Sequence, residues 1–275
     1  MILLQTEFLL QAKSTENLAE KIKSILGMEN VEIEQDIVKC RVFQEESKLK
    51  DIIRGVREYI VENLENIQVK RIIDKNYKTL PATDERQMEK DIIKAIKNEE
   101  DIHEKLFVMR RNRIIETITQ EYFSSNTYLN IDGFLNFRLS PYLSELEEII
   151  DYGAENFALK RQYKEFIGLL SSYISTQQSM IKELNIVVTE NREYIYYNEN
   201  HKMISREVEL EMSRELQPDY ESDDVLISLL INKNPENIVI HNRHFMKKEV
   251  YDTISLIFGE RVGNCNGCRL CTLLQ

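Results

Sequence analysis

The sequence predicts an α+β protein whose predominantly helical middle region is flanked by small α/β units at both ends. Strand and helix patterns alternate up to about residue 80, the alternation stops until about residue 182, and strands then return. The chain of 275 residues has only 8 Gly and 4 Pro, which disfavours folds built from many short strands and turns. We therefore expect three parts: residues 1–80, residues 81–182 and residues 183–275.

The first part has the pattern of strand, helix, two strands and helix. An apolar run opens the chain, and Ser14 and Thr15 are suitable N-caps for an amphipathic helix that ends at Gly27. Apolar and polar residues then alternate in residues 31–33 and 38–42, which predicts two half-buried strands. An apolar stripe over residues 49–67 predicts the second helix.

The middle part is predicted to contain long helices. Asp84 and Gln87 have the spacing of a cap pair at the start of one helix, and residues 104–123 form another. Residues 126–139 are the least helical stretch, and Ser140 then opens a helical region that extends to about residue 181. Eleven Tyr and Phe residues lie in residues 122–173, and this enrichment predicts the main helical core in preference to a ligand pocket.

The last part again mixes strands and helices. Residues 186–189 and 194–197 read as a β-hairpin, and residues 238–240 form a short β-branched strand. Helices are predicted over residues 225–231 and residues 247–258, after which Arg261 and Val262 lead into a group of cysteines.

Charge and composition narrow the classes of function. The net charge of −11 repels nucleic acid and anionic lipid, so binding of either would need a local basic patch. No stretch approaches the length of an apolar membrane span, and the apolar start of the chain carries Gln5 and Glu7 without a basic leader. Three of four Cys are crowded together, unlike the framework of a secreted disulfide-rich domain. We expect a cytoplasmic protein.

The most distinctive motif is the C-x-x-C-x-x-C run of Cys265, Cys268 and Cys271. Thiolates at this spacing in a tight turn can point at one ion, and Gly267 supplies a permissive backbone. A fourth ligand could come from His241, His244, Cys40 or an exogenous group. Zinc accepts a Cys3His set, whereas an iron–sulfur cluster with three Cys would leave one iron open.

Three interpretations of the run stay open at this point. The first is a site for zinc or an iron–sulfur cluster, and the second is a redox-active or disulfide-forming pair with lowered thiol pKa values. The third is that the cysteines are small buried side chains without chemistry, and His241 and His244 satisfied polar side chains.

Other candidate sites are weaker. Arg110, Arg111 and Arg113 form a compact basic cluster, which could contact phosphate but fits an ion-paired, solvated helix face better. The acidic run at residues 207–215 also fits a solvated face. The common nucleotide-binding and hydrolase motifs are absent, which leaves enzymatic activity open and favours a non-catalytic role.

Two segments carry a family resemblance. Residues 131–139 (IDGFLNFRL), followed by Tyr142, and residues 162–170 (QYKEFIGLL) resemble the YtxC-like family of sporulation proteins from endospore-forming bacteria. Gln162 stands where that family has a charged residue. The resemblance implies a role in sporulation but no particular activity, so no catalytic residue follows from it. Physically, Phe134, Phe137 and Tyr142 are expected in the core, and Arg138 is either a buried ion-pair partner or a binding residue.

The interpretation that the sequence favours is a non-catalytic, sporulation-associated protein that binds an unidentified protein partner and has a C-terminal metal-binding element. One alternative is an iron–sulfur or thiol redox protein that uses the C-x-x-C-x-x-C run. Another is a nucleic-acid-binding regulator that acts through residues 110–113.

Overall fold

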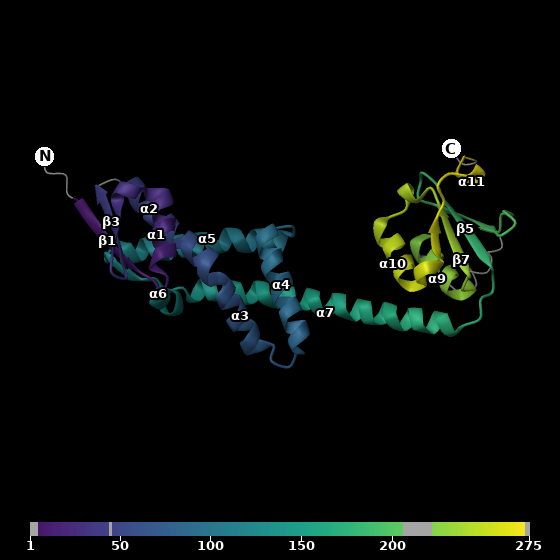
Figure 1. Ribbon diagram of the computed structural model, residues 1–275, viewed down its shortest axis with the longest axis horizontal. Coiled ribbons are helices and arrows are strands. Elements are labelled where there is room, and N and C mark those ends of the chain that lie inside the picture. Colours follow the sequence, from purple (N-terminus) through teal and green to yellow (C-terminus); the bar gives the residue numbers. More distant parts are fainter. Residues whose placement is uncertain (1–4, 44–45, 206–221, 273–275) are drawn as a thin grey trace. The chain divides into compact units, whose positions relative to one another are not determined.

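The computed structural model of the chain describes residues 5–43, 46–205 and 222–272. They form two compact units, and the boundary between the units falls between Leu159 and Lys160, within helix α7 (Ser140–Thr176) (Figure 1). The acidic run at residues 207–215 lies outside the described residues. The predicted division into three parts stays a prediction, and each unit is considered by itself below.

A mixed four-stranded sheet with the order β2-β3-β1-β4 lies in the first unit. Its strands are β1 (Gln5–Gln11), β2 (Val31–Glu34), β3 (Ile37–Phe43) and β4 (Tyr128–Asn130). Strand β3 pairs antiparallel with both β1 and β2, whereas β4 pairs parallel with β1. The first three strands follow the alternating pattern of the sequence, but β4 lies in a stretch that the sequence predicted only as non-helical.

Helices form most of the first unit. They are α1 (Thr15–Leu26), α2 (Glu46–Tyr59), α3 (Glu65–Asn76), α4 (Ala82–Asn98), α5 (Ile102–Phe123), α6 (Ile131–Phe137) and the part of α7 up to residue 159, with a 3-10 turn η1 (Met28–Asn30) and a π-helical segment η2 (Ile60–Leu64). Gly153 permits a close approach between helices, because a Cβ built there would stand 2.5 Å from Cγ1 of Ile92 on α4.

Helix starts explain three departures from the sequence prediction. Helix α4 begins after Pro81, so Asp84 lies in its first turn and the predicted cap pair with Gln87 is wrong. Helix α5 begins two residues earlier than predicted, because Asp101 and Glu104 form a capping box. Helix α6 occupies half of residues 126–139, the stretch that was predicted to be the least helical, and Asn130 caps it by accepting a hydrogen bond from the Gly133 N–H.

The aromatic-rich window is less buried than predicted. Phe134 and Tyr142 are core residues, as expected, but Phe137 is 85% exposed and the prediction that it is a core anchor is wrong. Tyr163, Phe166 and Tyr173 of α7 are also exposed. Aromatic composition indicated burial for the whole window, but a helix can bury only one face, and the other face of α7 carries aromatic side chains too.

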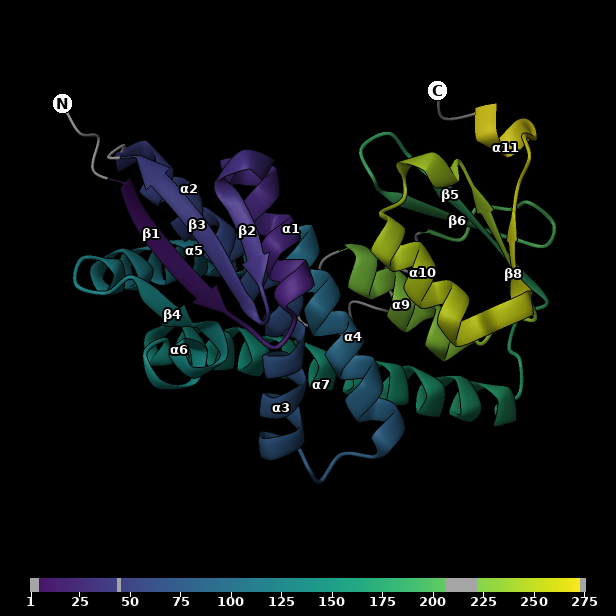
Figure 2. The same cartoon turned by 60° about the vertical axis from the view of Figure 1, so that its left-hand side comes forward.

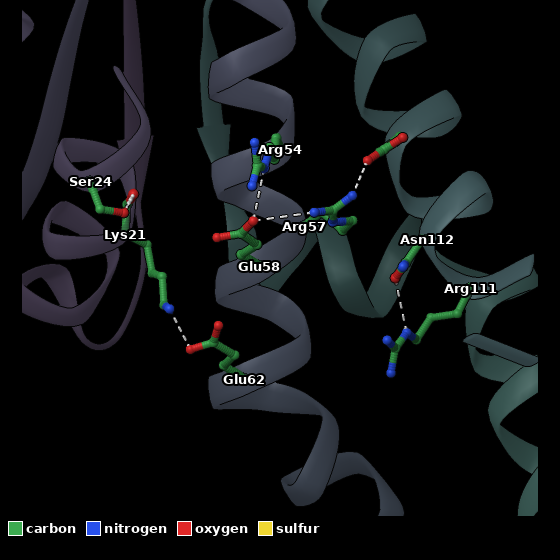
Figure 3. Close-up of polar contacts among 9 residues, drawn as sticks. Lys21, Ser24, Arg54, Arg57, Glu58, Glu62, Arg111 and Asn112 are labelled. Atoms are coloured by element: carbon green, nitrogen blue, oxygen red, sulfur yellow. Dashed lines mark hydrogen bonds and ion pairs between the residues drawn. The ribbon is translucent and has the colours of Figure 1, made fainter. Parts of the chain in front are cut away.

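A buried ion pair crosses the first unit between α3 and α5. Glu65 and Arg111 are both buried, with 2.7 Å between Oε1 of Glu65 and Nη1 of Arg111, and the Tyr142 hydroxyl donates to the other oxygen at 3.2 Å. Figure 3 shows the guanidinium of Arg111 extending from α5, where its Nε donates to Asn112. The predicted solvated face of the basic cluster is therefore wrong for Arg111, because residues 107, 111 and 115 form the buried side of α5.

We predict that the Arg111→Met variant lowers the free energy of unfolding by about 3 kcal/mol or more, because it leaves the Glu65 carboxylate buried without its cation. A double variant, Glu65→Leu with Arg111→Met, should recover part of this loss. The matched control is Arg110→Met, since Arg110 forms a more exposed ion pair with Glu145 and should contribute little. Chemical denaturation measures the free energy of unfolding of all three variants. Equal losses in Arg111→Met and Arg110→Met would contradict the assignment of Glu65 and Arg111 as a buried ion pair.

The second unit contains a four-stranded sheet with the order β6-β5-β7-β8. Its strands are β5 (Glu183–Val188), β6 (Tyr194–Asn198), β7 (Asn237–His241) and β8 (Val262–Asn264). Strands β5 and β6 form the predicted antiparallel hairpin, whereas β5, β7 and β8 run parallel. The C-terminal ends of these three parallel strands consequently lie at one edge of the sheet.

One face of this sheet is covered by helices. These are α9 (Ser222–Lys233), α10 (Lys248–Phe258) and the part of α7 from residue 160. Figure 2 shows α9 and α10 beside the sheet, and their apolar residues pack with Ile186, Ile238 and Ile240. The 3-10 turns η3 (Arg243–Phe245) and η4 (Gly259–Arg261) precede and follow α10.

On the opposite face lies a smaller apolar cluster. It contains Val187, Tyr197 and Leu270, and Leu270 belongs to the short terminal helix α11 (Arg269–Thr272). The long helices with a small mixed sheet in each unit confirm the predicted α+β class. None of the described helices combines the length and the apolar character needed to span a bilayer.

Candidate metal centre

The sheet topology of the second unit brings His241 and the cysteines together. His241 is the last residue of β7, and Cys265 directly follows β8, which pairs with β7 in parallel. The Cys265 N–H donates to the Ile240 carbonyl at 2.9 Å, which extends this pairing by one residue. The C-terminal edge of parallel strands is the usual place for a site in such sheets, because side chains from adjacent strand ends meet there.

Local backbone geometry turns the three cysteines inward. Gly267 has φ +116°, which an L side chain rarely adopts, and its N–H donates to the Cys265 sulfur at 3.4 Å. Cys268 then precedes α11, and Cys271 lies one turn further along this helix. The Asn242 side chain donates to the Cys271 carbonyl at 3.3 Å, which fastens the helix to the end of β7.

The result is a compact group of one nitrogen and three sulfur atoms. The ligand atoms of His241, Cys265, Cys268 and Cys271 all lie within 4.8 Å of one another. The Cys271 sulfur is 3.7 Å from the Cys265 sulfur and 3.9 Å from the Cys268 sulfur. Nδ1 of His241 is 3.3 Å from the Cys268 sulfur and 3.5 Å from the Cys271 sulfur.

These separations fit four ligand atoms arranged as a tetrahedron around one metal ion, with zinc as the reference case. Zn–S bonds of about 2.3 Å and Zn–N bonds of about 2.0–2.1 Å place two sulfurs roughly 3.8 Å apart and a sulfur and a nitrogen roughly 3.5 Å apart. A disulfide would bring two sulfurs to about 2.05 Å, and all four cysteines of the chain are free thiols. In a [4Fe–4S] cluster each cysteine binds a different iron, which separates the ligand sulfurs further than one shared ion does.

A buried hydrogen bond sets which nitrogen of His241 faces the sulfurs. Nε2 of His241 lies 3.0 Å from Oδ1 of Asn185, a buried residue on β5. The Asn185 amide nitrogen donates to Glu183 at 3.0 Å and to the Asn198 carbonyl at 3.3 Å, so its oxygen must face the imidazole and accept. His241 therefore carries its proton on Nε2, and its bare Nδ1 points at the thiols, as a metal ligand requires.

The electrostatic surroundings favour the ligand forms of His241 and Cys268 but not that of Cys265. Burial, followed by the influence of His201, lowers the pKa of His241 and keeps the imidazole neutral. Burial acts to raise the pKa of Cys268, but backbone N–H groups of Cys271 and Leu270 and the neighbouring thiols outweigh it and lower that pKa. Burial raises the pKa of Cys265 to about 11. A cation would offset this cost by binding the thiolate.

The other predicted site residues lie elsewhere. His244 is exposed in η3, with its ring 4.0 Å from the Phe245 ring, and it is outside the four-residue group. Cys40 is fully buried on β3 in the core of the first unit. Arg138 is exposed at the C-cap of α6, which excludes the buried ion-pair role that was one alternative for it.

The basic cluster does not form one exposed surface. Arg110 pairs with Glu145, and Arg111 is buried. Among the described residues, Arg113 is the one member of the three that is exposed and forms no ion pair.

Asn185 is the residue of this site that sequence reasoning missed. The only indication was a single amide side chain within the apolar stretch of β5, and its partner His241 is on another strand. A buried polar residue in such a strand needs a partner, but the sequence does not say which one.

The fold, together with the group of His241 and the three cysteines, defines a class of protein: an α+β chain with a candidate Cys3His metal centre. A profile of the YtxC-like family matches residues 50–263, so the chain belongs to that family, as the sequence motifs indicated. It is also 27% identical over 165 residues to the "Uncharacterized protein YtxC" of Bacillus subtilis (strain 168), an alignment that covers 58% of this chain and 56% of the relative. The chain thus spans little more than half of that relative's length. No solved structure matches.

The family match has a boundary that bears on the metal centre. The matched residues include Asn185 and His241 but end at residue 263, two residues before Cys265. Family membership therefore does not by itself imply the cysteine ligands.

We predict that the chelator-treated protein reacts with iodoacetamide at Cys265 and Cys268 but not at Cys40. Burial raises the pKa of Cys40 to about 12 and the side chain is fully covered, whereas Cys265 and Cys268 are partly exposed. Peptide mass spectrometry of the folded, chelator-treated protein measures the labelling of each cysteine. The same protein in denaturant, where all four cysteines should react, is the control. Native labelling of Cys40 as fast as Cys268 would contradict the described packing.

Proposed function

We propose that this chain is a zinc-binding protein in which one zinc ion is held by His241, Cys265, Cys268 and Cys271. The observation that carries the proposal is that four of the separations among these ligand atoms match the edges of a zinc tetrahedron, and all four atoms lie within 4.8 Å of one another. The buried Asn185 partner of His241 supports it, because zinc-binding histidines commonly donate their second N–H to such an acceptor.

The ion would be structural. Four protein ligands fill a tetrahedral shell and leave no position for substrate or an activated water, which a catalytic zinc needs. Bound there, zinc joins the segment after β8 to the end of β7 and holds Leu270 over Val187 and Tyr197. This is the C-terminal metal-binding element of a non-catalytic protein, and it agrees with the absence of common catalytic motifs from the sequence.

We predict one zinc per chain in protein purified without added metal, and loss of that zinc in the triple variant Cys265→Ser, Cys268→Ser, Cys271→Ser. Elemental analysis measures both. His244→Ala is the matched control, since His244 is an exposed histidine outside the group, and it should keep its zinc. Equal zinc in the wild type and the triple variant would refute the site, and a brown protein absorbing at about 400 nm would favour the iron–sulfur alternative.

We predict that Asn185→Leu lowers zinc affinity by about 10- to 100-fold without abolishing binding, because it removes the acceptor that fixes the tautomer of His241. Competition with a chromogenic chelator measures the affinity. Asn237→Leu is the control: it changes an exposed Asn at the opposite end of β7. Unchanged affinity in Asn185→Leu would mean that this hydrogen bond does not position the ligand.

We further propose that the protein acts in the cytoplasm during sporulation by binding a protein partner through α7. The sporulation role rests on the family resemblance. Partner binding is supported by Phe166, Leu169 and Tyr173, which are 60%, 73% and 59% exposed and share one face of the helix. Ile167 and Ile174 on an adjacent face of α7 pack into the core of the second unit.

The test is a pull-down from sporulating cells with the wild type and two variants. Phe166→Glu should lose a partner that the wild type retains, because it places a charge within the apolar surface. Ser175→Glu adds the same charge at an exposed position on a different side of the helix and should retain the partner. No specific partner for the wild type, or equal loss in both variants, would count against the proposal.

A further inference from the structure

The first unit contains a cavity that is separate from the metal centre. It has a volume of about 420 Å³ and lies between η2 and α3 on one side and the C-terminal end of α4 on the other, with Arg111 of α5 contributing to its wall. Its apolar lining is aliphatic and comes from Val61, Val69, Ile93 and Ile96. The volume suits a small metabolite.

Arg111 offers the cavity an unused hydrogen-bond donor. Its Nη1 donates to Glu65 and its Nε to Asn112, but no described residue bonds to its Nη2. Only 7% of Arg111 is exposed, and both Arg111 and Glu65 line the cavity. Because a buried ion pair seldom stabilises a fold more than apolar side chains of similar size, stability alone does not account for placing this pair here.

The helix beside the cavity is irregular at the same place. Residues 60–64 form the π-helical segment η2, which supplies Val61 and Glu62 to the lining and directly precedes Glu65. Short π-helical segments are uncommon inside α-helices and are frequently found at functional sites. Figure 3 shows Glu62 turned toward Lys21, and their ion pair of 2.5 Å leaves this carboxylate already neutralised.

The remaining charges of the lining are one cation and one anion at its edge. Lys97 and Glu99 lie near the end of α4, both exposed, and Glu99 has left-handed backbone angles at the C-cap. Burial raises the pKa of Glu65, whereas Arg111, Tyr142 and Lys97 lower it, so Lys97 lies close enough to act on the buried pair. Three carboxylates in the lining disfavour a phosphorylated or polyanionic ligand.

We propose that this cavity binds a free α-amino acid with an aliphatic side chain. The ligand carboxylate accepts from Nη2 of Arg111 and from Lys97, and the ligand ammonium faces Glu99. The aliphatic side chain packs against Val61, Val69, Ile93 and Ile96. Each charged group of the zwitterion thus meets an opposite charge, and its apolar group meets an apolar wall.

The test is an NMR titration of the full chain, labelled at Ile and Val methyl groups, with L-leucine. Shifts centred on Val61, Val69, Ile93 and Ile96 are expected, and no shifts at any methyl up to millimolar ligand would overturn the proposal. N-acetyl-L-leucine lacks the ammonium and isoamylamine lacks the carboxylate, so each should bind at least tenfold more weakly. Binding of inorganic phosphate or citrate at these methyls, without binding of leucine, would overturn the ligand class.

Two lysine variants localise the interaction without disturbing the buried pair. Lys97→Gln should weaken L-leucine binding at least tenfold, because it removes the exposed cation of the cavity lining. Lys94→Gln makes the same change on the exposed side of α4, away from the lining, and should bind like the wild type. Equal affinity of both variants, with their methyl spectra otherwise unchanged, would contradict the assigned pose. None of these outcomes depends on zinc binding by the second unit.

Discussion

The parallel pairing of β5, β7 and β8 is the constraint on which the metal centre depends. It places the ends of β7 and β8 at one sheet edge, so that His241 meets Cys265 although helix α10 separates them in sequence. It also aligns Val187 of β5 with His241, which puts Asn185 on the same face two residues away. A one-residue change in the register of β7 would turn His241 to the opposite face, toward α9 and α10, and separate it from the cysteines. The ligand set is thus a property of strand register as much as of the C-x-x-C-x-x-C run.

Order in the segment after β8 comes from contacts of two kinds. Leu270 supplies apolar contact with Val187 and Tyr197, but α11 has only four residues and cannot be stable as an isolated helix. Polar contacts from Asn242 and the Gly267 N–H add to this without creating a sizeable core. A bound ion joining this segment to His241 would supply the missing free energy, which is the usual reason that small metal-bound elements fold.

Periodicity and capping residues predicted most of the fold, because those patterns are local. The hairpin, the strand at β7 and helices such as α5 and α10 follow from alternation, from helical spacing and from Gly259. Residues 126–139 escaped prediction, since β4 is a strand only through its pairing with β1 and α6 depends on an Asn130 cap. The exposure of Phe137 and the burial of Arg111 reversed expectations from residue type, because the orientation of each helix is fixed by its neighbours.

The sequence was sufficient to predict the sulfur ligands of the candidate site, but not how the ligands are arranged in space. Three cysteines with two residues between neighbours indicated convergence on one ion, and both His241 and His244 were candidates for completing the shell. Only the sheet distinguishes them, because His241 ends β7 with its side chain on the cysteine face while His244 lies in an exposed turn. Asn185 and the cavity beside Arg111 depend on contacts between distant segments, which spacing in the sequence does not encode.

Extended X-ray absorption fine structure at the zinc edge, recorded on protein purified with its own metal, tests the central claim most directly. The proposed zinc site predicts a four-coordinate ion with three sulfur ligands at about 2.3 Å and one nitrogen ligand at about 2.0–2.1 Å. A shell of five or six oxygen and nitrogen ligands, or fewer than three sulfurs, would contradict the assignment of His241, Cys265, Cys268 and Cys271 as the ligand set.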